Sequence, residues 1–179
     1  DGMSDYEPTT KQIEAVQDVV AATPFVLKQV LLTTPNGVQG IVLRGIDPQR
    51  EGHVTELAKN LGTGELSDLS KPVKVKQPPA DDPTGPAVET EKPGIILGKE
   101  LAMRLGAFVG DTVNVVSPVG PISAMGMVPK IRTFAIVGLF HSGMYEYDSS
   151  LAYIDLAEAQ KFFNMGATVS GIEVKVTDV

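Results

Sequence analysis

The chain has 179 residues, a formal net charge of −7, 42% hydrophobic residues and no cysteine. This length suffices for one sizeable domain or two small ones. The negative charge argues against nucleic acid and anionic membrane surfaces as partners, because both need clustered Lys or Arg. The absence of cysteine excludes disulfides and thiolate metal sites. No apolar run of about 18 residues is present, so no segment of this sequence is expected to span a membrane.

The first part of the chain is expected to fold as a helix followed by two strands. Apolar residues at helical spacing predict a helix over residues 10–22, which follows a capping box at Thr9 and stops before Pro24. Runs rich in strand-forming residues at 25–33 and 38–46 flank an Asn-Gly pair, which predicts a hairpin because both residues tolerate a positive φ. This order indicates an α+β layer with the helix on one face of a sheet.

The middle of the chain is expected to alternate short elements with a long connection. A short helix over residues 54–61 precedes a segment, residues 70–93, that is rich in proline and charge. We expect that segment to be a flexible loop, because it has little to bury. A strand at 95–97 and a helix at 99–105 follow, with Gly106 as the helix cap.

The next feature is a pair of predicted strands with an unusual connection. β-branched and aromatic residues at 112–116 and 133–140 predict strands that pair with each other. Prolines in the connection, residues 117–132, remove backbone donors, so we expect it to project as a hairpin arm. Its apolar side chains favour a docking surface. The alternative is that the arm folds back onto its own domain.

The end of the chain is expected to add a strand, a helix and a strand. Residues 151–154 are typical of a strand, and Asp155 is placed to cap the helix that follows. Phe162 and Phe163 lie in the apolar stripe of this helix. Alternation at residues 172–176 predicts a half-buried final strand.

His141, Ser142 and Asp148 are the residues that could be combined into a catalytic triad. Adjacent side chains on a strand point to opposite faces, so His141 is poorly placed to act as a base for Ser142. His53 and His141 are too few and too far apart to indicate a metal site. The glycines lack a phosphate-binding Walker pattern. We therefore expect a non-catalytic domain without metal or cofactor, with a small-ligand-binding enzyme domain as the alternative from another class.

Four parts of the sequence carry a resemblance to a known family: Gly94–Ala102, Val109–Asp111, Met125-Gly126 with Pro129 and Arg132, and Gly143–Tyr153. Together they resemble the LolC/LolE family, the permease subunits of the bacterial lipoprotein-releasing ABC transporter, which are related to MacB. The resemblance extends over most of the chain except residues 70–92. It implies a MacB-like periplasmic core domain of the α+β class, with two small mixed subdomains and a projecting β-hairpin arm.

The resemblance and the element order suggest a division of the chain. Residues 1–46 and 145–179 are expected to form one discontinuous α+β subdomain. Residues 47–144 are expected to form an inserted β-rich subdomain, which carries the arm at 117–132 and the flexible loop at 70–93.

The function implied by the resemblance is lipoprotein transport. The full permease would lie in the bacterial inner membrane, with this domain on its periplasmic face, and would pass lipoproteins to the periplasmic carrier LolA. A partner LolC/LolE permease subunit and a separate LolD-type ATPase, reached through the membrane part, would complete the transporter.

In LolC-type members a projecting hairpin called the hook engages LolA, and residues 118–131 match it. The residues expected to bind the carrier are Pro121, Ile122, Met125, Gly126, Met127, Val128, Pro129 and Arg132. The arm departs from the LolC-type pattern at Ala124, so a LolC-like and a LolE-like role both stay open. A MacB-like efflux permease or an FtsX-like permease is the alternative within the wider family.

Overall fold

The computed structural model describes residues 2–79, 82–118, 122–123 and 126–177, and for 122–123 it describes the backbone alone. Its α-helices are α1 (Tyr6–Glu14), α2 (Pro48–Val54), α3 (Leu57–Asn60), α4 (Lys99–Leu105), α5 (Tyr145–Ser150) and α6 (Leu156–Phe162), with a 3₁₀ helix η1 (Leu66–Ser70). Its strands are β1 (Val19–Thr34), β2 (Gly37–Ile46), β3 (Leu61–Thr63), β4 (Val73–Gln77), β5 (Val88–Lys92), β6 (Gly94–Gly98), β7 (Thr112–Ser117), β8 (Ile122–Ser123), β9 (Gly126–Met127), β10 (Lys130–Phe140), β11 (Leu151–Asp155) and β12 (Gly171–Val176).

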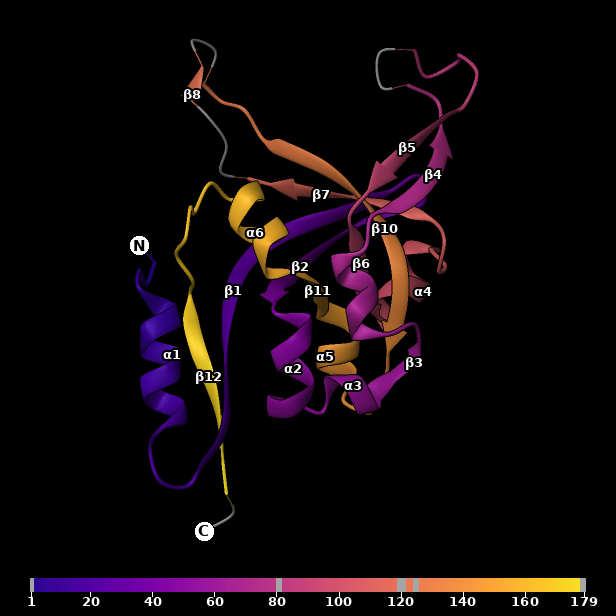
Figure 1. Cartoon of the computed structure of the whole chain (residues 1–179). Helices are drawn as coiled ribbons and strands as arrows, with labels where there is room; N and C mark the ends of the chain where they lie inside the picture. The colour runs from indigo at the N-terminus through magenta and orange to yellow at the C-terminus, as the bar shows by residue number, and fades with distance from the viewer. Residues whose placement is uncertain (1, 80–81, 119–121, 124–125, 178–179) are drawn as a thin grey trace.

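One eight-stranded mixed sheet organises these elements (Figure 1). Its strand order is β12-β1-β2-β11-β6-β10-β3, and β7 pairs with both β1 and β10. The pairings therefore run in a closed cycle, from β7 through β1, β2, β11, β6 and β10 back to β7. Closure satisfies the backbone groups that an open sheet leaves exposed at its edges. The pairs β4–β5 and β8–β9 form separate two-stranded sheets.

Strand β1 holds this arrangement together because it has three partners. Its first part pairs with β12, its second part with β2, and residues 31–33 pair with β7 on the other edge. Side chains alternate across a strand, and Val26, Val30 and Leu32 accordingly face the core. Leu27, between them, is exposed.

The core lies mainly inside the cycle of strands. The larger apolar cluster joins β1, β2, β6, β7, β10 and β11 to α4 and α6, with Leu101, Leu105 and Phe162 as fully buried helix residues. A smaller cluster, which includes Ile96 and Phe140, packs against α3 and η1. All five residues of β6 are buried, as expected for a central strand covered on both faces.

Most predicted elements are confirmed, and the first helix is the main error. The prediction placed a helix over residues 10–22, whereas α1 ends at Glu14 and β1 already begins at Val19. The N-cap is Asp5 rather than Thr9, and it makes no side-chain cap. Asp18 turns the chain with a φ of 69°, and the β-branched residues after it pair with β12. The β-branched residues therefore follow their preference for a strand.

The first hairpin is confirmed, but its turn differs from the expectation. Thr34 pairs with Gly37, which leaves Pro35 and Asn36 as the two loop residues. Neither Asn36 nor Gly37 has a positive φ. Pro35 fixes its own φ near −65°, which favours an ordinary turn over a mirror-image one. The Thr34 hydroxyl accepts from the Asn36 backbone N–H at 3.2 Å and donates to the Leu105 carbonyl at 2.9 Å, so the turn is also anchored to α4.

The region after β2 also differs from the expectation. The helix predicted at 54–61 is replaced by α2 and α3, because Asp47 caps α2 by accepting from the Gln49 backbone N–H at 3.0 Å and proline occupies its first turn. The expected loop at 70–93 contains the hairpin β4–β5. The division into two subdomains stays a prediction, and strands from both proposed parts share the main sheet.

A buried acid near Arg44 gives a testable pH dependence. Glu51 is 1% exposed, its Oε1 lies 3.9 Å from Arg44 and 3.2 Å from the Thr55 hydroxyl, and its Oε2 has no hydrogen-bond partner among the described residues. Burial raises the pKa of the Glu51 carboxyl, and the opposing effects of Arg44 and Thr55 do not cancel it. A raised folded-state pKa means that this group stabilises the fold most at low pH, and that the stabilisation is lost as the pH rises through that value.

We therefore expect Glu51→Gln to unfold at the same temperature as the wild type or higher at pH 8, because the neutral amide avoids the cost of a buried charge. Between pH 5 and pH 8 its melting temperature should fall less than that of the wild type. Thermal unfolding followed by circular dichroism at both pH values measures this. If the melting temperature of the variant is lower than that of the wild type by the same amount at pH 5 and at pH 8, Arg44 fully compensates the charge of Glu51.

Candidate functional site

The arm between β7 and β10 projects from the main sheet (Figure 1). The last β7–β10 pair is Ser117 with Lys130, and beyond it β8 and β9 pair as a separate small hairpin. Gly126, with a φ of 108°, supplies a backbone conformation that other residues rarely adopt. Figure 1 shows β8 extending away from the sheet, in the direction opposite to α2 and α3.

The side chains described on the arm are largely exposed and apolar. Met127 is 57% exposed and Ile131 is 62% exposed, and Val128 between them is also exposed. Of the residues predicted to bind a carrier, the structure brings Gly126, Met127, Val128 and Pro129 together on this arm. Pro121 and Met125 lie outside the described residues, and Ile122 is described only by its backbone, which pairs with Met127.

Arg132, the remaining predicted residue, lies at the base of the arm and is bound within the domain. Its Nη1 is 2.5 Å from Oε2 of Glu158 on α6, and its guanidinium lies 5.7 Å from the centre of the Phe134 ring. Both Arg132 and Glu158 are partly exposed. The guanidinium thus ties the base of the arm to α6, in addition to any contact with a partner.

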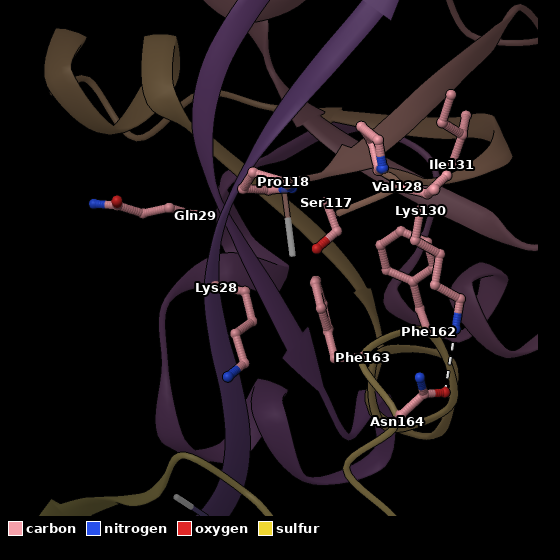
Figure 2. A pocket seen from close by; sticks show the side chains of 11 residues that line it. Lys28, Gln29, Ser117, Pro118, Val128, Lys130, Ile131, Phe162, Phe163 and Asn164 are labelled. Atoms are coloured by element: carbon pink, nitrogen blue, oxygen red, sulfur yellow. Dashed lines mark hydrogen bonds between the residues drawn. The ribbon is translucent and has the colours of Figure 1, made fainter. Parts of the chain in front are cut away.

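A groove lies where the arm meets β1 and α6, and we call it the arm-base groove. It has a volume of about 650 Å³ and is lined by Lys28, Gln29, Ser117, Pro118, Val128, Pro129, Lys130, Ile131, Phe162, Phe163 and Asn164. Figure 2 shows the two phenylalanine rings and Ser117 around the hollow, with Gln29 pointing away from it. Sequence reasoning missed Lys28, Asn164 and the groove as a whole, because these residues come from distant segments and no local pattern joins them.

The residues considered for a triad do come together, but in a different arrangement. Asp148, only 1% exposed, accepts hydrogen bonds from the backbone N–H and the hydroxyl of Ser142, each at 2.7 Å. Its other oxygen lies 2.7 Å from Nδ1 of His141. Ser142 therefore bonds the carboxylate and not the imidazole, so His141 is not in position to remove its proton. This cluster fixes the connection between β10 and α5, which is a structural role.

Hydrogen bonding sets the charge state of Asp148. Burial by itself disfavours the charged form, but the two bonds from Ser142 and the contact with His141 outweigh it and hold the pKa of the Asp148 carboxyl below its usual range. The carboxylate is therefore charged at neutral pH and can anchor the start of α5.

Comparison with solved structures identifies the fold. The extracellular domain of the noncanonic ABC-type transporter YknZ from Gram-positive bacteria matches 99% of this chain and 75% of its own chain, with a TM-score of 0.56 and 15% sequence identity. The periplasmic region of MacB from Actinobacillus actinomycetemcomitans matches 96% of this chain and 64% of its own, with a TM-score of 0.54 and 16% identity. The chain therefore has the α+β fold of MacB-like periplasmic domains, as predicted.

Sequence relatives narrow this class to a family, although no protein-family model matches the chain. The lipoprotein-releasing system transmembrane protein LolC of Neisseria meningitidis serogroup B is 32% identical over 98% of this chain. The protein of the same description from Xylella fastidiosa (strain Temecula1) is 32% identical over 90% of it. The chain belongs to the LolC/LolE family of ABC transporter permeases. It spans 38% and 34% of the lengths of these two relatives, and no helix in its described part is long and apolar enough to cross a membrane.

Proposed function

We propose that this chain is the periplasmic domain through which a lipoprotein-releasing permease docks the carrier LolA, and that the arm at 117–132 is the docking element. The observation that carries this proposal is the exposure of Met127, Val128 and Ile131 on a hairpin that projects from the sheet. Exposed neighbouring apolar side chains on a projecting element are typical of interaction sites.

The arm is expected to lose little conformational entropy on docking. Pro118 and Pro129 lie at its two sides near the sheet and restrict the backbone, so less conformational entropy is lost when a partner binds. Methionine at position 127 is flexible and polarisable, which suits a contact with an apolar surface of variable shape. The partner surface that fits this arm is therefore an apolar cavity, which is the kind of surface that a carrier of acylated proteins must present.

In this proposal the whole permease lies in the inner membrane and the domain faces the periplasm. Lipoproteins would leave the membrane part, which the chain does not include, and pass to the carrier held by the arm. A LolD-type ATPase would power the cycle from the other side of the membrane, and a second permease subunit would pair with this one.

The test is binding of the LolA of the same organism to the isolated domain by isothermal titration calorimetry. We expect Met127→Glu to weaken binding by at least about 1.4 kcal/mol, or tenfold, because it places a charge in an apolar contact. Its melting temperature should stay unchanged, since Met127 contributes little to the core.

The matched control is Met103→Glu, which makes the same change at an exposed position of α4. This control should bind LolA as the wild type does. Equal binding by Met127→Glu and the wild type, with both folded, would contradict the proposed docking element. A domain that does not bind LolA at all would instead favour a MacB-like or FtsX-like role.

A further inference from the structure

The arm-base groove combines an apolar floor with a positive edge, and its size falls in the range of small-molecule sites. Ligand sites commonly enclose about 300 to 1,000 Å³, and this groove encloses about 650 Å³. The ring of Phe163, which follows α6 directly, lines the groove and is only partly buried, whereas the neighbouring ring of Phe162 is buried in the core. Val128 and Ile131 close the groove from the arm side (Figure 2). This floor can receive an aliphatic chain.

The charged side chains that line the groove are all of one sign. Lys28 and Lys130 line it, and none of its described lining residues is Asp or Glu, although the chain as a whole carries a net charge of −7. Lys130 is held in place, because its Nζ lies 3.2 Å from Oδ1 of Asn164 and 5.4 Å from the centre of the Phe162 ring. The local potential therefore favours an anion even though the chain as a whole repels one.

Both ammonium groups lie on one side of the groove, and the apolar side chains of the arm lie on the other. In Figure 2 the ammonium group of Lys28, the ammonium group of Lys130 and the amide of Asn164 lie at the lower side, with the Phe163 ring between the two lysines. Pro118, Val128 and Ile131 lie at the upper side of the same view. A ligand that matches this separation has an anionic end and an apolar end.

A peptide segment suits the groove less well than an alkyl chain. Every buried peptide group needs hydrogen-bond partners. Two lining residues, Pro118 and Pro129, have no backbone N–H, and the Gln29 amide points away from the hollow. An alkyl chain carries no polar groups, so it can cover the ring of Phe163 without leaving donors or acceptors unpaired.

We propose that the arm-base groove binds a single-chain anionic amphiphile, with its alkyl chain on Phe163, Val128 and Ile131. Its carboxylate or phosphate head lies at the side of the groove where Lys28 and Lys130 each offer an ammonium group. This site goes beyond carrier docking, because Lys28 and Phe163 lie outside the arm. It places a lipid-binding hollow at the base of the docking element.

The test is isothermal titration of the domain with dodecanoate below its micellar concentration. Octanoate has the same head and a shorter tail, and each buried methylene is worth about fourfold in affinity, so octanoate should bind at least tenfold more weakly. Dodecyl maltoside has the same tail and no charge, and it should also bind about tenfold more weakly, because it loses the charge-assisted contacts.

The protein variants locate the site. The double variant Lys28→Glu/Lys130→Glu should weaken dodecanoate binding at least about tenfold, because both changes reverse the charge at the head-group end. Lys99→Glu is the matched control, since Lys99 is exposed at the start of α4 and does not line the groove. This control should bind as the wild type does, and all variants should melt at the wild-type temperature.

Three results would overturn the proposal. They are no dodecanoate binding by the wild type, equal binding by the double lysine variant, and equal binding of the uncharged dodecyl maltoside.

Other occupants of the groove would give different results. If the double variant loses LolA binding while dodecanoate does not bind at all, the groove is part of the protein interface. A dimer seen by sedimentation in the wild type and lost in the double variant, without dodecanoate binding, would assign the groove to a second copy. Carrier docking through Met127 is tested separately and stands or falls independently.

Discussion

Replacing Phe162 with alanine is expected to lower the free energy of unfolding by about 3 to 5 kcal/mol, because a large, fully buried ring is removed from the core. The Phe162 side chain is 1% exposed and belongs to the larger core cluster. Its ring packs edge to face on Phe163, with 4.8 Å between the ring centres.

For a domain of this size, such a loss corresponds to a decrease in melting temperature of about 6 °C or more. Urea unfolding followed by far-UV circular dichroism measures it directly. Phe108→Ala is the matched control, because Phe108 is 72% exposed and its loss should change stability by less than about 0.5 kcal/mol. A cost near zero for Phe162→Ala would mean that α6 does not pack on the sheet as described.

A buried phenylalanine at the end of α6 could be predicted from the sequence because a local rule decides it, although the sequence did not separate Phe162 from Phe163. Asp155 accepts a hydrogen bond from the Ala157 backbone N–H at 2.9 Å, which fixes where α6 begins, and the helical period then fixes its buried face. Gly106 is a second case, since its φ of 58° closes α4 as predicted. Both signals depend only on residues within one turn of the position they determine.

The start of β1 could not be predicted in this way. Val19 and Val20 also fit the apolar stripe of a helix, and a local pattern cannot separate the two structures. The deciding interaction is the pairing of Val19 with Val176 at the other end of the chain. The hairpin β4–β5 was missed for a related reason, because its strands are short and rich in charge, and Val75 is its only residue buried in the described part.

The candidate site shows the same limit. The arm was predicted because prolines and exposed apolar residues lie within one continuous segment. The arm-base groove was not, because Lys28 on β1, Lys130 at the start of β10 and Asn164 after α6 are brought together only by the closed sheet. The family resemblance predicted the arm as a binding element, but it carried no information about a hollow built from three separate elements.

Asp148→Ala is the second substitution with a large expected effect. The carboxylate accepts two hydrogen bonds from Ser142 and contacts His141, all at 2.7 Å. Hydrogen bonds to a buried charged group are worth about 1.5 to 3 kcal/mol each, and they are not independent here, so we expect a total loss of about 3 kcal/mol. Glu146→Ala, at an exposed position of the same helix, should cost less than about 0.5 kcal/mol.

The pH dependence of this loss of stability distinguishes the contribution of the Asp148 charge from the contribution of its side-chain shape. The pKa of Asp148 is lowered in the folded state, so its contribution to stability is fully present above the unfolded pKa and is lost as the pH falls through the folded one. Asp148→Asn keeps the shape and removes the charge. The difference in unfolding free energy between the wild type and Asp148→Asn, measured in urea, should therefore be largest at pH 7 and shrink as the pH is lowered toward about 3. A difference that stays constant over this range would show that Asp148 acts through packing, and that the hydrogen bonds from Ser142 do not depend on its charge.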